Sequence, residues 1–249
     1  MKFSVASEHR QYFQKHLSIE FEGLLTQEQL TTLQTACGAT LATRLETRPG
    51  RLKDKSADQI FSAGRDLWRS DDQIKKAVTQ RLLAEIASEL IERKPLRLGY
   101  DQFFPFPVQM QNFVSTESPF TDFLQQQPTI KEISCINNIL CGLVLCLSGA
   151  KGKEILDVAP MNESPTLLIP PVNIFPKIAG HGVFFHPDAR LDLYQLLERP
   201  SQDYLMIIYT QARSQYTLQE SDLNTHALKR LGYVFGDRLS DKLNPIVYR

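Results

Sequence analysis

The amino-acid sequence predicts an α+β fold: a double-stranded β-helix, or jelly roll, with N-terminal helices packed against one of its sheets. The order of the elements is the first observation behind this prediction. Helical patterns lie mostly before residue 96, and strand patterns follow them, which is typical of α+β rather than alternating α/β proteins. The second observation is the spacing of the strand patterns, because many short strands bounded by turn residues indicate two packed antiparallel sheets.

The first predicted elements are a short strand over residues 17–25, with a turn at Gly23, and a helix that begins after Thr26. Thr26 and Gln29 form a capping box, in which each side chain accepts a backbone N–H at the start of the helix. We expect Gly38 to end this helix, because glycine readily takes the left-handed conformation found just after helix C-termini.

A longer helix is predicted over residues 70–93, where it would buttress one sheet. Ser70 is its expected N-cap, and Lys94-Pro95 ends it because proline disfavours helix at the preceding residue. Apolar residues recur at every fourth position and form one face of the helix: Ile74, Val78, Leu82, Ile86 and Leu90.

Strand candidates follow Pro95 and are separated by Pro, Gly, Asn and Asp residues. They are residues 96–104, 107–115, 133–139, 142–147, 154–158, 167–169, 182–185 and 204–211. Asn137 and Asn138 are interpreted as a turn. Two more helices are expected, one over 189–197 capped by Asp188 and one over 218–231 followed by Gly232.

We expect residues 1–249 to form a single domain, because no Gly/Ser-rich linker or internal repeat divides the chain. The helical buttress would lie mainly in residues 17–95 and the β-core mainly in residues 96–211. A C-terminal helix and tail would occupy residues 212–249.

The charge balance argues against a nucleic-acid partner. The sequence has 28 Lys and Arg residues against 28 Asp and Glu residues, whereas nucleic-acid binders usually carry a basic surplus. Its longest unbroken apolar run, residues 139–147, is about half the length that a bilayer requires. With no apolar signal segment either, we expect a cytoplasmic protein with no membrane association.

The cysteines are interpreted as buried, reduced thiols, because the sequence contains no C-x-x-C pair. Cys141 and Cys146 are separated by an odd number of positions. On one strand they would therefore point to opposite faces and could not ligate one metal together.

Other polar and aromatic residues leave several readings open. The charged segment 44–69 has mixed signs, which favours a solvated loop over a phosphate-binding patch. Trp68 is expected to plug the core or cap the following helix. Asp101, among aromatic residues on a predicted strand, would line a pocket or face outward from an edge strand.

One candidate metal centre can be drawn from the sequence. His186 and Asp188 form a His-x-Asp pair, and His226 would complete a facial triad of two imidazoles and one carboxylate for Fe(II). A structural interpretation competes with it, because Pro187-Asp188 is also an ordinary turn and helix N-cap. His226 is moreover expected on a helix rather than a strand.

Four segments, residues 21–30, 96–102, 178–186 and 204–209, follow one another in an order that resembles the phytanoyl-CoA-hydroxylase-like Fe(II)/2-oxoglutarate oxygenases. The first is similar to the initial strand and helix of that family, and the helix before the second to the one that precedes the catalytic barrel. The third is similar to the strand leading to the distal iron-binding histidine. The fourth is similar to the strand after the arginine that binds 2-oxoglutarate. The resemblance implies a double-stranded β-helix.

The resemblance also implies an iron site, from which this sequence departs. The family's first two ligands form a His-x-Asp motif near the start of the barrel, but no histidine occurs between His16 and His181. The nearest match is Phe120-Thr121-Asp122, with phenylalanine where an imidazole is required. The distal histidine would fall near Leu191 or Leu193. The arginine would fall near Gln202 or Asp203, where a carboxylate would repel 2-oxoglutarate.

Three hypotheses about function follow. The first is a binding or interaction domain that keeps the oxygenase fold without conventional activity and takes an unknown small molecule or protein as its partner. The second is an oxygenase-like enzyme with unconventional ligands, which would use Fe(II) and 2-oxoglutarate. The third is a divalent-cation-dependent transcriptional regulator, which the residues support least. We expect no bound cofactor or metal under the first hypothesis.

Overall fold

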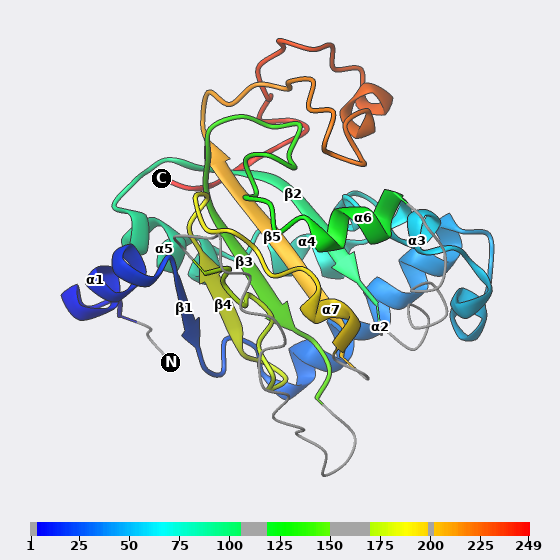
Figure 1. Ribbon diagram of the computed structural model, residues 1–249, viewed down its shortest axis with the longest axis horizontal. Helices are drawn as coiled ribbons and strands as arrows, with labels where there is room; N and C mark the ends of the chain where they lie inside the picture. The colour runs from blue at the N-terminus through cyan, green and yellow to red at the C-terminus, as the bar shows by residue number, and fades with distance from the viewer. Residues whose placement is uncertain (1–3, 106–118, 150–169, 199–201) are drawn as a thin grey trace.

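The computed structural model describes residues 4–105, 119–149, 170–198 and 202–249, and a six-stranded antiparallel sheet lies at its centre (Figure 1). The strand order across the sheet is β1-β4-β3-β5-β2-β6, so the first and last strands in the sequence form its two edges. The strands are β1 Ser18–Phe21, β2 Leu96–Phe104, β3 Ile139–Cys146, β4 Gly182–Phe185, β5 Tyr204–Gln211 and β6 Ile246–Tyr248.

Most of the described strands were predictable. The predicted strands 96–104, 182–185 and 204–211 are confirmed as β2, β4 and β5, and β1 lies within the predicted segment 17–25. Strand β3 begins at Ile139 rather than at residue 142. Strand β6 was not predicted, because three half-buried residues carry too short a pattern to recognise.

The prediction of a strand over residues 133–139 is wrong except for its last residue. Most of this segment is irregular, with bends and one isolated bridge from Ile136 to Tyr216, and Asn138 takes a left-handed conformation with φ +53° just before β3. A bend does lie at Asn137 and Asn138, but in the described part of the chain it adjoins one strand, β3, rather than joining two. The predicted strands 107–115, 154–158 and 167–169 lie outside the described residues, so the second sheet of the jelly roll stays a prediction.

Helices from the N-terminal part of the chain cover one face of the sheet, here called the helical face (Figure 1). Leu143 and Leu145 of β3 pack against that layer. Val144 and Cys146, which alternate with them, point to the opposite face, here called the inner face. The helices are α1 Ser7–His16, α2 Gln27–Arg44, α3 Ala57–Ala63, α4 Asp72–Val78, α5 Arg81–Ile91, α6 Pro119–Gln125 and α7 Gln195–Glu198.

Helix α2 begins as predicted but does not end at Gly38. The Thr26 hydroxyl accepts the N–H of Gln29, and the Gln29 side chain accepts the N–H of Thr26, so the capping box is confirmed. The helix continues to Arg44 because Leu41 and its neighbours are buried against the core. This burial outweighs the roughly 1 kcal/mol by which glycine disfavours a helix interior.

The helix predicted over residues 70–93 is two helices, α4 and α5, with a break at Thr79 and Gln80. The Thr79 hydroxyl donates to the Lys75 carbonyl, a bond that competes with regular helix geometry. Asp71, not Ser70, is the N-cap, since its carboxylate accepts the N–H groups of Gln73 and Ile74.

Two further helix predictions are largely wrong. Of the helix predicted over residues 189–197, only the short helix α7 forms near its end, because Arg190 and Leu191 form bridges to Thr129 and Val172 instead. Only the 3-10 helix Ala227–Leu231 forms within residues 218–231. There Asp222 is buried, accepts the backbone N–H of Cys135 and pairs with Arg65, so tertiary contacts replace the helical hydrogen bonds.

The cysteine predictions are confirmed. All four cysteines are free and buried. Cys141 packs on the helical face of β3 and Cys146 on the inner face, as their odd spacing requires. Among the described helices, none combines the length and apolar character needed to cross a bilayer.

Candidate functional site

A small cavity lies on the inner face of the sheet, where strand β2 turns the side chains of Tyr100, Gln102 and Phe104 toward it. Its volume is about 20 Å³, which is room for about one water molecule. The walls are mostly apolar and aromatic. They consist of Phe61, Arg65, Tyr100, Gln102, Phe104, Phe123, Ile130, Ile133, Leu191, Leu193 and Met206.

Arg65 is the charged group in this wall, and a close backbone approach brings it there. Residues 64–66 run alongside β2, with a bridge between Arg65 and Gln102. Only glycine fits at position 64, since a Cβ atom would lie 2.6 Å from the Phe103 carbonyl oxygen. The Arg65 Nε donates to the Gln102 side-chain oxygen at 3.2 Å.

The Arg65 guanidinium is neutralised by Asp222 from the C-terminal segment. One of its terminal nitrogens lies 3.1 Å from the carboxylate, and the two side chains are 6% and 1% exposed. Asp222 also accepts the backbone N–H groups of Cys135 and Asn224, each at 2.8 Å. The carboxylate is therefore well provided with donors, which a buried charge requires.

This arrangement fixes the charge states around the cavity. Burial by itself would lower the pKa of Arg65, but the Asp222 carboxylate and other nearby groups together outweigh it, so the pKa is raised. Burial raises the pKa of Tyr100, and the guanidinium 3.7 Å from its ring centre offsets this only in part. The cavity thus presents a neutral phenol and a permanently charged, already paired guanidinium.

The residues at the expected iron and 2-oxoglutarate positions do not suit those ligands. Leu191 and Leu193, at the expected distal-histidine position, are buried and line the cavity. At the expected arginine position, the Gln202 amide donates to the Lys177 carbonyl at 2.6 Å and accepts the Tyr204 hydroxyl at 2.5 Å. The Asp203 carboxylate accepts a bond from Gln34 in helix α2.

The nearest match to the first His-x-Asp motif falls on helix α6. Asp122 is exposed there, while the next residue, Phe123, is buried and lines the cavity. A buried phenyl ring faces the cavity from this helix, and the carboxylate does not. Within the described part of the chain, these residues fit neither Fe(II) nor 2-oxoglutarate in the family's manner.

The alternative triad of His186, Asp188 and His226 is only partly assembled. The His186 Nδ1 lies 3.5 Å from the Asp188 carboxylate, which also pairs with Lys131. His226 immediately precedes the 3-10 helix Ala227–Leu231 and packs against Phe235, with 6.0 Å between the ring centres. In the described segments, no three His, Cys, Asp or Glu side chains are arranged to hold a metal ion.

Two pKa shifts belong to this pair. Partial burial lowers the pKa of His186, so the imidazole is more readily neutral. The hydrogen bond from Lys131 lowers the pKa of Asp188, so the carboxylate is more readily ionised. Both side chains therefore have the protonation states of metal ligands, but an ammonium group already neutralises the carboxylate.

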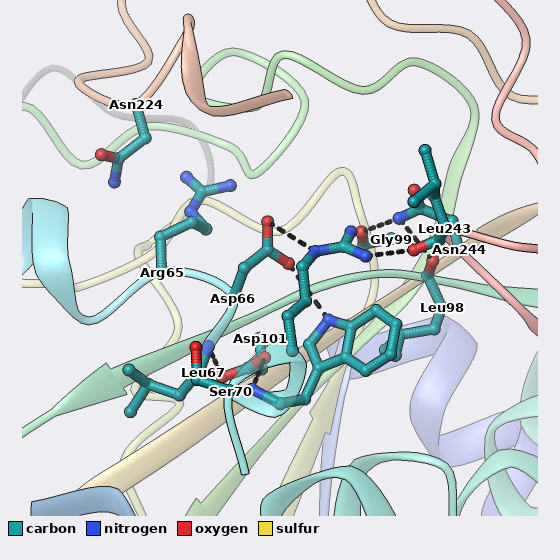
Figure 2. Close-up of polar contacts among 12 residues, drawn as sticks. Arg65, Asp66, Leu67, Ser70, Leu98, Gly99, Asp101, Asn224, Leu243 and Asn244 are labelled. Atoms are coloured by element: carbon teal, nitrogen blue, oxygen red, sulfur yellow. Dashed lines mark hydrogen bonds and ion pairs between the residues drawn. The ribbon is translucent and has the colours of Figure 1, made fainter. Parts of the chain in front are cut away.

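Asp101 is a buried anchor on the helical face, so its interpretation as an outward-facing edge residue is wrong. Strand β2 lies between β5 and β6, and the Asp101 carboxylate accepts the N–H groups of Leu67 at 3.1 Å and Trp68 at 3.2 Å. Trp68 is buried as predicted, and its indole donates to Asp66 at 3.2 Å (Figure 2).

Burial, followed by the nearby Asp66 charge, raises the pKa of Asp101 to about 7. The bonds from the Leu67 and Trp68 N–H groups oppose this shift only in part.

The interpretation of residues 44–69 as a solvated loop is wrong for its later part. Arg65 and Asp66 are both buried, and the segment contains short helices.

Sequence reasoning missed the pairing of Arg65 with Asp222. The two residues are 157 positions apart and neither belongs to a motif. Arg65 stands among other charged residues, so no local signal distinguishes it.

These features define a fold of the kind found in non-haem 2-oxoglutarate-dependent enzymes, and the fold predicted from the sequence resemblance is confirmed at that level. The structure is similar to the non-haem α-ketoglutarate-dependent carbocyclase SnoK from nogalamycin biosynthesis, with a TM-score of 0.61 and 15% identity. The similarity covers 97% of this chain and 96% of SnoK. The α-ketoglutarate-dependent epimerase SnoN gives a TM-score of 0.58 and 13% identity, over 96% of this chain and 97% of that one.

A further similar structure is CT296 from Chlamydia trachomatis. It has 19% identity and a TM-score of 0.41, and the match covers 84% of this chain and 98% of CT296. No protein-family model matches the chain. No curated protein matches it either.

Proposed function

We propose that this protein is a binding or interaction domain that keeps the double-stranded β-helix of the 2-oxoglutarate oxygenases without their iron and 2-oxoglutarate chemistry. The observation that carries the proposal is the cavity on the inner face. Its volume is about 20 Å³, and Leu191 and Leu193 stand in its wall where the resemblance expects a metal-binding imidazole. Ligand pockets are usually about 300 Å³ or larger.

The proposed loss of chemistry also rests on the buried charges. An oxygenase of this family needs a cation that is free to pair with the far carboxylate of 2-oxoglutarate. The guanidinium of Arg65 reaches the cavity, but Asp222 already pairs with it and Gln102 accepts from it. Opening that pair for a ligand would leave a buried carboxylate without its counter-ion.

Metal analysis and calorimetry under anaerobic Fe(II), or Mn(II) as a stand-in, test this proposal with and without 2-oxoglutarate. The parent protein and a His186→Ala variant should both lack stoichiometric metal and should give no heat of 2-oxoglutarate binding. His181→Ala is the matched control, because its imidazole lies close in the sequence but pairs with Glu20 instead.

One observation favours an enzyme with unconventional ligands, namely the contact between His186 and Asp188. Stoichiometric metal with an affinity of about 1 µM, lost in His186→Ala and kept in His181→Ala, would establish that alternative. Such a result would refute the proposal that the chemistry is gone.

A further inference from the structure

A second hollow lies at the edge of the sheet, where strand β2 begins and the C-terminal segment passes over it. Its volume is about 520 Å³, within the usual range for small-molecule sites. It is lined by Lys94, Pro95, Arg97, Ala212, Asp241, Ile246 and Arg249. Three of these side chains are positively charged and one is negatively charged.

The floor of this hollow is a buried and immobilised cation. The Arg97 side chain is only 5% exposed, and its Nε donates to the Ala212 carbonyl at 3.0 Å. One terminal nitrogen donates to the Asn244 carbonyl, and the other lies 2.6 Å from the Asp241 carboxylate. Because the guanidinium is held from three sides, an incoming anion would not have to order it.

The wall formed by the C-terminal segment is also fixed in place. The Asn244 side-chain amide donates to the carbonyl oxygens of Leu98 at 3.2 Å and Gly99 at 2.7 Å (Figure 2). The Leu98 N–H donates to the Pro245 carbonyl at 3.0 Å, and β6 then pairs with the start of β2. The hollow is therefore preformed.

The side chains that line the hollow carry a net positive charge. Lys94 and Arg249 are exposed on its rim, and neither forms an ion pair with any described residue. Asp241 supplies the negative charge in the lining, and its side chain is 64% exposed. A ligand anion can displace such an exposed carboxylate from Arg97 at little cost, because water solvates the carboxylate afterwards.

We propose that this hollow binds a small molecule carrying at least two negative charges on phosphate or carboxylate groups. The ligand would bridge the Lys94 ammonium and the Arg249 guanidinium above Arg97. Guanidinium groups suit both kinds of oxyanion, because their N–H groups match two oxygens at once. The site lies away from the inner-face cavity, so this inference does not depend on the absence of iron chemistry.

Titration calorimetry at constant ionic strength tests the site, with pyrophosphate as the phosphate probe and citrate as the carboxylate probe. We expect saturable binding of at least one probe at concentrations of about 1 mM or below. Lys94→Gln and Arg249→Gln should each weaken binding about five-fold, the effect of losing one near contact between charges in water. Lys76→Gln, on an exposed part of helix α4, should leave the affinity unchanged.

Asp241→Asn should change the affinity for the probe in the opposite direction. It removes the competing carboxylate, so binding of the same probe should become tighter. Weaker binding in this variant would overturn the inference. So would the absence of saturable binding for both probes, or equal binding by the parent, Lys94→Gln and Arg249→Gln. Circular dichroism of each variant establishes that it is folded.

Discussion

The buried ion pair of Arg65 and Asp222 should be strongly coupled, and a double-mutant cycle measures that coupling. The pair joins the segment after α3 to the C-terminal segment, with 3.1 Å between the charged groups and almost no exposure to solvent. Arg65→Met leaves a buried carboxylate without its counter-ion, and Asp222→Asn leaves a buried guanidinium. Breaking a pair of this kind from one side costs about 3–5 kcal/mol.

The double variant should cost much less than the sum of the single variants, because it leaves no uncompensated charge in the interior. We expect a coupling free energy of about 2 kcal/mol or more. Asp222→Asn retains an amide oxygen that can still accept the N–H group of Cys135 or Asn224, so this substitution removes little besides the charge. Urea unfolding, followed by circular dichroism and by the fluorescence of the single tryptophan, Trp68, provides the free energies.

A surface pair offers the control for this cycle. Arg51 and Asp54 lie 2.7 Å apart, but their side chains are 73% and 42% exposed. Arg51→Met with Asp54→Asn should therefore show a coupling below about 1 kcal/mol. Additive costs for Arg65→Met and Asp222→Asn, within the error set by the control cycle, would refute the account of the buried charges.

Three other perturbations test the core. Ile86→Asp should unfold the domain, because Ile86 is fully buried. Leu82→Asp should destabilise the domain less, because Leu82 is only partly buried, and circular dichroism distinguishes the two outcomes. Gly64→Ala should lower the free energy of unfolding by about 1–3 kcal/mol, since its Cβ would meet the Phe103 carbonyl, while Gly50→Ala should have little effect in the same denaturation assay. The raised pKa of Asp101, about 7, should make stability fall as the pH rises from about 4 to about 7, by at most about 1.4 kcal/mol per pH unit. The folded state binds one more proton than the unfolded state in that pH window. Asp101→Asn should therefore flatten this part of a profile of stability against pH. An unchanged slope would rule out Asp101 as the source of the pH dependence.

Local signals in the sequence determined a large part of the sheet and its cover. Strands β4 and β5 were predictable because each is a buried, mostly apolar run bounded by turn residues. Strand β2 was predictable because it follows Pro95 and its apolar and aromatic residues are interspersed with polar ones over a short segment. The start of α2 was predictable because Thr26 and Gln29 satisfy the first N–H groups within four residues. The residue types at the positions where the resemblance expects iron ligands can also be read from the sequence alone.

Tertiary structure decided the features that depend on distant partners. Helix α2 passes through Gly38 because its later residues are buried against other segments, a stabilisation that the local sequence does not contain. Residues 218–226 do not form the predicted helix, because Asp222 finds its partners 87 and 157 positions earlier in the chain.

Both candidate sites form through contacts between segments that are distant in the sequence. Arg65 reaches the inner-face cavity through a pairing with β2, and Arg97 becomes the floor of the second hollow only when Asn244 and Asp241 come to lie beside it. The sequence determined which chemical groups this protein possesses. Folding decided which of them meet, because a buried charge takes its position from partners that local sequence patterns do not reveal.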